Sequence, residues 1–288
     1  MAEADVLVRT RIERYRAPAG DPGWFGPDSI AWQVHADLPS MLVGGLCALM
    51  LQTLHPKVMQ GVEDHSGYRS DPFGRLQRTA EFIAGTTYGS EGLAAELVDR
   101  VRRIHTVVEG ESPAGPYRAS DPELLTYVHV TEVWSFLRAH QRYSGHLLLA
   151  DEKDRYLEEM SIVAHRLGAG PVPVRTAAVR EYLRSVRPVL EGTALARRTV
   201  RFLTSSPFGD AVLQRYAYTT ICEAAIDLLP GWARTALGLY RPVPVRVALV
   251  RPAAVGLTAA LRAVVGSSPI LAAAKERAGA LPREETAS

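Results

Sequence analysis

The residues of this chain that are best suited to redox or metal chemistry are histidines on apolar helix faces. His105 follows Val101 and precedes Val108 at helical spacing, and His129 lies one turn after Leu125. An unpaired polar group that is buried costs ~1–3 kcal/mol, so each imidazole needs a partner for its ring nitrogens. That partner is either a backbone carbonyl or a threonine of the core, or an iron held in an apolar pocket. Spacing alone leaves both interpretations open.

Two arginines and a threonine form a second group of interest. Arg75 and Thr79 are four residues apart and share a helix face, with Arg78 beside them and with Phe82 and Ile83 on the adjoining face. Arginines on a helix are most often solvated surface residues. Next to an iron cofactor with a charged periphery, the same side chains would supply the cations that such a cofactor needs.

Several catalytic classes are excluded by missing motifs. The chain has no GxGxxG or GxxxxGK[ST] loop, no GxSxG elbow and no HExxH. No carboxylate stands three residues before any of the eight histidines, so a carboxylate-bridged di-iron bundle is not expected. The two cysteines, Cys47 and Cys222, lie in apolar helical patterns and are too few for a disulfide scaffold or a zinc site. We expect both to be buried thiols.

The composition is that of an ordinary soluble globular protein. The chain has 288 residues, a formal net charge of +2, 47% hydrophobic residues and 22% charged residues. Its length suits one or two domains with a substantial core. Because the charge is nearly balanced, the chain lacks the excess of Lys and Arg that binding to nucleic acid requires, so no nucleic-acid partner is expected.

The elements expected to position the candidate residues are almost all helices. Ser40 is expected to cap a helix that is apolar nearly all round and therefore central, and Pro56 to break or bend it. The run Ser120-Asp-Pro-Glu predicts the start of a helix that reaches Tyr143. Further helices are expected at 73–88, 90–109, 151–167, 176–186, 192–203, 211–228 and 253–265, and no segment alternates convincingly with period two. The sequence predicts an all-α, single-domain bundle.

The chain is expected to have three parts. Residues 1–27 form an N-terminal arm that ends in a Pro/Gly-rich stretch, 28–250 form the helical domain, and 251–288 form a C-terminal helix and tail whose last ten residues are frayed. No secretory signal is visible. The apolar run at 41–51 is too short to span a membrane, and prolines and arginines interrupt the run at 243–271, so no transmembrane segment is expected. We expect a cytoplasmic protein, with peripheral membrane contact of the C-terminal segment left open.

Taken together, several segments resemble one known family. These segments are MLVGGLCALMLQTLHPKVMQGVEDHS, GRLQRT, RVRRIHTVVEG, PYRASDPELLTYVHVTEVWS and LLPGWARTALGLYRP, and they cover the chain from Trp32 to Pro242. In their order and spacing they are similar to the latex-clearing-protein and MpaB-type oxygenase family. That resemblance implies an all-α fold with a globin-like helical core around haem b.

The resemblance assigns roles to the first group of residues. His105 matches the proximal ligand of the haem iron, and Arg75 and Thr79 match a polar pair in the distal pocket. Arg78 stands where latex-clearing proteins carry a lysine that can approach the iron. A guanidinium has no lone pair to offer, so the sixth iron position is expected to hold water or stand open.

The resemblance also places residues around the cofactor. His129 and Thr131 match a second histidine-containing helix, and we expect His129 to be a pocket residue, with axial ligation as a lesser alternative. His55 and His65 match family positions too, where packing and pocket-shaping roles are expected.

The implied activity is activation of O2 at haem iron, with oxidation or C=C cleavage of a small apolar substrate that is isoprenoid- or lipid-like. Two alternatives remain. One is another haem protein, such as a peroxidase, dehydrogenase or sensor, because all of these use a proximal histidine. The other is a haem-free helical module that binds a lipid or a protein. The oligomeric state is not indicated by any pattern in the sequence.

Overall fold

The structure is a computed structural model that describes residues 10–205 and 211–279. Within these residues the chain is almost entirely helical, and its only sheet is one two-stranded antiparallel hairpin. The predicted all-α, single-domain fold is confirmed. Cys47 and Cys222 are both buried and unpaired in it, as expected.

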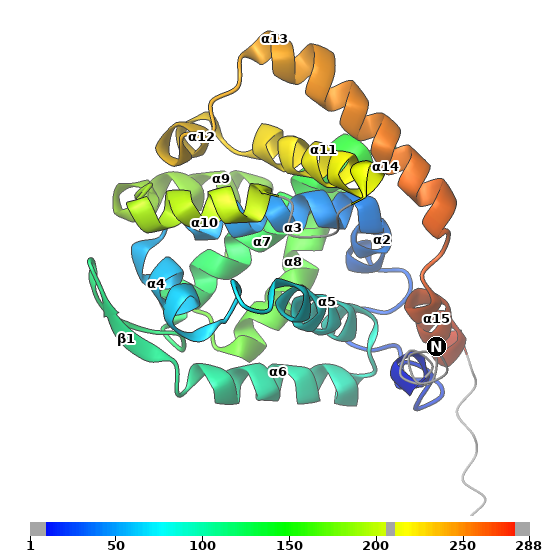
Figure 1. The fold of residues 1–288 in the computed structure, drawn as a ribbon. Helices are drawn as coiled ribbons and strands as arrows, with labels where there is room; N and C mark the ends of the chain where they lie inside the picture. Colours follow the sequence, from blue (N-terminus) through cyan, green and yellow to red (C-terminus); the bar gives the residue numbers. More distant parts are fainter. Residues whose placement is uncertain (1–9, 206–210, 280–288) are drawn as a thin grey trace, which may run out of the picture.

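The core is built on one apolar helix. α3 (Leu38–Gln52) lies between α7 (Pro122–Tyr143) and α11 (Val212–Leu228) in Figure 1 and packs against both. A Cβ at Gly44 would lie 2.9 Å from the Cδ1 of Phe136, so this close approach of α3 to α7 requires a glycine. A central helix that is apolar on all sides can therefore be covered on all sides.

Two antiparallel helices carry most of the candidate residues. α5 (Pro72–Tyr88) and α6 (Glu91–His105) lie one above the other in Figure 1. The carboxylate of Asp71 accepts a hydrogen bond from the backbone N–H of Gly74 at the start of α5, and Ser90 caps α6 in the same way. The short link at Gly89 and Ser90 therefore fixes the two helices as a hairpin.

The remaining helices surround this core. They are α2 (Ile30–Ala36), α4 (Pro56–His65), α8 (Ala150–Leu167), α9 (Thr176–Ser185), the 3₁₀ turn η1 (Arg187–Val189), α10 (Ala194–Thr204), α12 (Gly231–Leu237), α13 (Val243–Val245), the π-helical η2 (Arg246–Val250), α14 (Arg251–Val265) and α15 (Pro269–Gly279). As expected, Pro56 separates α4 from α3.

Two predicted helix boundaries were wrong. Asp37 holds the N-cap position of α3 and Ser40 lies inside the first turn, because Pro39 favours a helix start just before it. α6 ends at His105 rather than at 109, and β1 (Glu109–Ser112) then pairs with β2 (Gly115–Arg118). Gly115 has a φ of +92°, a conformation that allows the tight turn of this hairpin.

The C-terminal helix is longer than predicted. α13, η2 and α14 form one helical run, Val243–Val265, that crosses residue 250. Pro244 and Pro252 stand in the first turns of α13 and α14, and the π-helical turn between them accommodates the second proline. Among the described residues, this is the one unbent helix long and apolar enough to cross a membrane; α2 and α3 pass the same test only as a pair bent by 92°.

The described part of the N-terminal arm packs against the C-terminal end of the chain. Arg277 of α15 is buried and donates hydrogen bonds to the carbonyl oxygens of Tyr15 and Asp21. Nine of the ten residues predicted as a frayed tail, 280–288, lie outside the described residues.

Candidate functional site

The candidate residues gather at the open end of the α5–α6 hairpin. Arg75 lies in the first turns of α5 and His105 is the last residue of α6. Because the two helices are antiparallel, these positions lie at the same end of the hairpin, away from the link at Gly89 (Figure 1). Residues 30 positions apart in the sequence are thereby brought to one place.

His105 has a ring nitrogen that lacks a partner. The side chain is half-buried, and among the described residues its buried Nδ1 has no hydrogen-bond partner. Burial lowers the pKa of His105 below its usual value, so the imidazole is neutral at pH 7. A neutral imidazole with an unused nitrogen has a lone pair to give to a metal.

Arg75 and Arg78 differ although they lie on the same helix. Arg75 is half-buried and forms no ion pair with any residue that the structure describes; burial, and then repulsion by Arg78, lower its pKa. Arg78 is exposed and forms an ion pair with Asp71 at 3.2 Å. Thr79 is exposed, and its hydroxyl donates to the carbonyl oxygen of Arg75 at 3.0 Å. A guanidinium stays charged at any accessible pH, so within the described residues Arg75 is a cation without a paired anion.

α7 contributes His129 and Thr131 from within the protein. His129 is buried, and burial, followed by the charge of His165, lowers its pKa to about 4. Thr131 is fully buried, and its Oγ1 donates to the carbonyl oxygens of Tyr127 and Val128 at 2.9 Å each. His129 is therefore neutral at pH 7, while the hydroxyl proton of Thr131 is used within its own helix.

Sequence reasoning missed Glu132, which lies one turn after His129 on α7. Burial raises the pKa of this carboxyl to about 7, although the side chain is only half-buried. With this pKa, the carboxyl can gain or lose a proton near neutral pH. The sequence signal that could have identified Glu132 is its position as the only acidic residue in the largely apolar stretch from Leu124 to Leu137.

The other two candidate histidines lie near α4. His55, at the N-cap position of α4, has its ring centroid 5.1 Å from that of Tyr127 and a buried Nδ1 with no partner among the described residues. His65 is exposed, and its Nε2 lies 3.3 Å from the carbonyl oxygen of Glu109. His55 thus packs against α7, while His65 links α4 to β1.

A chain of buried polar groups runs through α2, α5 and α8. The Nδ1 of His35 lies 2.7 Å from the hydroxyl of Thr87, and its Nε2 lies 3.0 Å from the hydroxyl of Tyr156. Burial lowers the pKa of His35 to about 3, so this ring is also neutral. The interior around His35 therefore disfavours charge, while both ring nitrogens of His35 have hydrogen-bond partners.

The structure places these residues on the α5–α6 hairpin and on α7, which packs against α8 as α6 does, without joining them directly. In the part of the chain that it describes, no hydrogen bond or ion pair links Arg75, His105 and His129, and no three His, Cys, Asp or Glu side chains gather as a metal cluster. A porphyrin brings four nitrogen ligands of its own, so one imidazole is enough to hold its iron. The donor set fits a haem better than a metal ion bound by protein groups alone.

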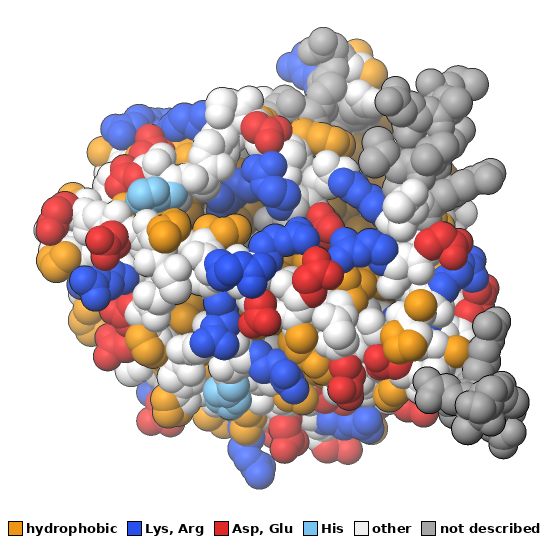
Figure 2. Space-filling model, turned by 90° about the horizontal axis from the view of Figure 1, so that it is seen from below, with side chains coloured by type: hydrophobic (Ala, Val, Ile, Leu, Met, Phe, Trp, Pro, Cys, Tyr) orange, Lys and Arg blue, Asp and Glu red, His pale blue; other side chains and the backbone are white. Residues whose placement is uncertain are grey.

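The outer surface near α6 has mixed charge. α6 lies along the lower edge in Figure 1, and the face seen from below shows Lys and Arg interspersed with Asp and Glu and with scattered apolar side chains (Figure 2). On α6 itself, Arg100 forms an ion pair with Glu96 at 3.0 Å. An exposed helix of this chain is therefore normally covered by paired charges, while its apolar side faces the core.

A model of the family described as ER-bound oxygenase mpaB/B'/Rubber oxygenase, catalytic domain, matches residues 32–265. The chain therefore belongs to this family and carries its oxygenase catalytic domain, as the sequence resemblance implied. The match also includes all of α14. Comparison with curated proteins and with solved structures finds no significant match.

Proposed function

We propose that this chain is a haem-b-dependent oxygenase that uses O2 to oxidise or cleave a small apolar substrate, isoprenoid- or lipid-like. Family membership supports the oxygenase activity, and rubber, the polyisoprenoid in the family description, supports the substrate class. The observation that carries the haem assignment is the buried, unpartnered Nδ1 of the neutral His105. Haem bound there supplies the redox chemistry with O2.

His105 is the proposed iron ligand. Its position at the end of α6 fixes the backbone, and the low-dielectric surroundings keep the ring unprotonated, which ligation requires. The rings of His129 and His55 also have lowered pKa values, and we assign them to the pocket wall, together with Thr131. The chain thus offers one proposed ligand and a wall of uncharged groups.

Arg75 is the proposed donor to bound oxygen or to a polar end of the substrate. Its guanidinium is half-buried and pairs with no carboxylate in the part of the chain that the structure describes, which leaves its N–H groups available there. Donors held in place in a poorly hydrated site stabilise developing negative charge, because little reorganisation is needed during the reaction. Thr79 holds the first turns of α5 through its bond to the carbonyl of Arg75 and completes the proposed pair.

Arg78 is assigned to the cofactor periphery. It is exposed at the same end of α5 and is held there by Asp71. A guanidinium at this position can pair with a carboxylate of a porphyrin but cannot bind iron.

Glu132 is the proposed proton-holding group. With a pKa of about 7 it exists in both protonation states at neutral pH, which suits transfer of a proton to or from a reacting oxygen. The poorly hydrated interior that shifts this pKa also favours an apolar substrate. We further propose that the enzyme is cytoplasmic or membrane-peripheral.

The experiment is product analysis with ¹⁸O2. Protein supplied with hemin is incubated with polyisoprene or squalene in air and under nitrogen, and carbonyl products are measured by mass spectrometry. We expect products that carry ¹⁸O and that form only with O2. Turnover that needs hydrogen peroxide and gives no ¹⁸O incorporation would instead show a peroxidase. No haem uptake would indicate the haem-free binding module.

A further inference from the structure

We propose that the helical run Val243–Val265 is a lipid-docking surface, with its axis parallel to the membrane and its outer face in the hydrocarbon region of one leaflet. The proposal concerns an interaction surface and does not depend on the haem chemistry. It rests on the inward direction of the charged side chains along this run, which is the reverse of that on an ordinary surface helix, and on an outer face that is apolar.

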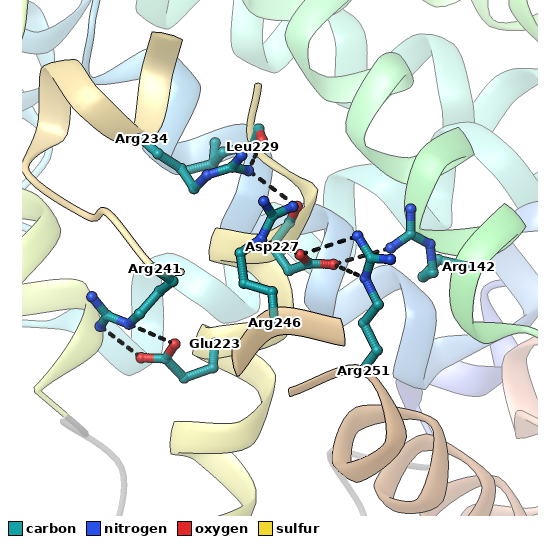
Figure 3. Close-up of polar contacts among 8 residues, drawn as sticks. All are labelled: Arg142, Glu223, Asp227, Leu229, Arg234, Arg241, Arg246 and Arg251. Atoms are coloured by element: carbon teal, nitrogen blue, oxygen red, sulfur yellow. Dashed lines mark hydrogen bonds and ion pairs between the residues drawn. The ribbon is translucent and has the colours of Figure 1, made fainter. Parts of the chain in front are cut away.

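All three charged residues of the run turn toward the protein. Arg246 and Arg251 donate to the carboxylate of Asp227 on α11, and Figure 3 shows both reaching it together with Arg142 of α7. Arg262 donates to Asp37 at 2.7 Å. These arginines therefore attach the helix to the body of the protein and leave no charge on the outer side.

The outer face is entirely apolar. Every exposed residue from Pro242 to Val265 is Pro, Val, Leu, Ala or Gly, so none has a side chain that can form a hydrogen bond. The largest exposed side chains are Val243 at 61%, Leu249 at 64% and Val264 at 84%. Only 11% of the most apolar window of this run is buried, so the helix is not a core helix.

A comparison with α6 shows how unusual this apolar outer face is. Both α6 and α14 have 15 residues and lie at an edge of the molecule (Figure 1). On α6, Leu93 and Leu97 are buried while Glu96 and Arg100 are exposed. The face that contains α6 mixes acids and bases (Figure 2). On α14 the charged side chains turn inward, beside Ala254, Leu257 and Leu261, which pack against the core. The exposed side chains are apolar, which is unfavourable in water but suits a lipid environment.

The absence of polar groups from the outer face favours lipid over a protein partner. Protein interfaces carry a polar rim and about one hydrogen bond per 100–200 Å². This face offers no donor or acceptor side chain along 23 residues, a length of about 34 Å at 1.5 Å per residue. Its lack of charge is complementary to hydrocarbon, which has no charges or hydrogen-bonding groups either.

The inward arginines also determine the orientation. A helix that crossed the bilayer would carry Arg246, Arg251 and Arg262 into hydrocarbon and would remove them from their carboxylates. Lying flat, the run keeps these ion pairs on the protein side. Tyr240, which is 71% exposed, and Arg241, which pairs with Glu223 in Figure 3, precede the run and suit the headgroup level.

The test is flotation of the full-length protein with vesicles of phosphatidylcholine alone. We expect the wild type to float with the vesicles, and to do so equally in 0.5 M salt, because binding is driven by apolar burial. Leu249→Asp with Val264→Asp is expected to reduce the bound fraction at least about tenfold. The matched control is Leu147→Asp with Val189→Asp, which changes side chains that are 77% and 57% exposed elsewhere, and it is expected to bind as the wild type does.

A second measurement does not require the double variant to fold. A polarity-sensitive fluorophore on Val264→Cys should shift to the blue with vesicles, and on Leu147→Cys it should not; Cys47 and Cys222 are buried and are not expected to react. Wild-type protein that stays in the aqueous fraction, or equal shifts at both positions, would overturn the proposal. So would a wild-type dimer that the Leu249/Val264 variant converts to monomer without any vesicle binding, because the partner would then be a second copy.

Discussion

Two regions of this protein differ in whether their polar side chains have hydrogen-bond or ion-pair partners. Around Asp227, a fully buried carboxylate receives hydrogen bonds from Arg142, Arg246 and Arg251. Burial acts to raise the pKa of Asp227, and the arginines outweigh it, so the pKa falls below its usual value. At the open end of the α5–α6 hairpin, by contrast, His105 and Arg75 have no such partners among the described residues.

We interpret the paired region around Asp227 as part of the scaffold, and the open end of the α5–α6 hairpin as part of the functional site. A buried charge that is paired joins helices, as Asp227 joins α11 to α7 and α14. A polar group left without a partner lowers stability, and a bound ligand is one way to complete it. If this distinction holds, substitutions at the site should change haem binding or turnover, and substitutions in the scaffold should change stability.

The largest expected effect is at His105. His105→Ala should abolish retention of haem, because the proposed axial ligand is lost, while the free energy of unfolding without haem changes by less than about 1 kcal/mol, since the ring has an unsatisfied nitrogen. Haem content is measured by the pyridine haemochrome assay and stability by urea unfolding, with His65→Ala as the control. Normal haem content in His105→Ala and loss in His129→Ala would move the ligand to His129.

At Asp227 we expect the opposite result, in which stability is lost and haem uptake is kept. Asp227→Ala leaves three arginines without their carboxylate and should lower the free energy of unfolding by about 3–5 kcal/mol. Glu223→Gln, which removes the partly exposed pair with Arg241 shown in Figure 3, should cost at most about 1 kcal/mol. Any folded Asp227→Ala protein should still take up haem. Equal losses in the two variants, measured in urea, would contradict the distinction.

Within the site, the two arginines of α5 should differ. Arg75→Ala should retain haem and lower kcat by roughly 10²–10³-fold, the range for removing one positioned donor. Arg78→Ala removes an exposed residue that pairs with Asp71 and is assigned to the cofactor periphery, so it should weaken haem binding but leave the kcat of the haem-loaded protein nearly unchanged. Steady-state kinetics with the preferred substrate compare them. A kcat of Arg75→Ala equal to that of the wild type would contradict the assignment of Arg75.

The smallest effect is on the pH dependence of stability. The pKa of His129 is about 4 in the folded protein and near 6.5 when unfolded, so the unfolded chain binds more protons between these values. Stability from His129 is thus full above pH 6.5 and is lost as the pH falls toward 4. Glu132, whose folded pKa is raised, has the opposite slope between about pH 4.5 and 7.

The contribution of His129 is isolated by comparing variants. The free energy of unfolding of His129→Gln, relative to the wild type, should rise by about 2 kcal/mol as the pH falls from 6.5 to 4, because the contribution of Glu132 cancels in the difference. Urea titrations at several pH values measure it. A pH-independent difference would show that His129 is not buried as a neutral ring.

The helices could be predicted from the sequence where local chemistry fixes them. Asp71 and Ser90 cap α5 and α6, Asp121 and Pro122 start α7, and apolar periodicity defines the faces between these ends. The short β1–β2 hairpin and the true end of α6 were missed, because four-residue strands leave no periodic pattern. The run across Pro252 was missed because a π-helical turn, not a break, accommodates the proline.

The site could be predicted only in part. The spacing of His105 and of Arg75, together with the family resemblance, pointed to two residues that the fold brings to one end of a hairpin. Whether a polar side chain has a partner depends on contacts between distant segments, as with Asp227 and Arg251, and no local pattern encodes it. For the same reason neither the raised pKa of Glu132 nor the inward direction of Arg246 could be foreseen.

The most direct test of the central claim, that His105 holds haem b, is an optical titration of the purified wild type with hemin, before and after reduction with dithionite. We expect a saturable Soret band at one hemin per chain, distinct from that of free hemin and shifted by reduction. A spectrum that remains that of free hemin at every ratio would contradict it.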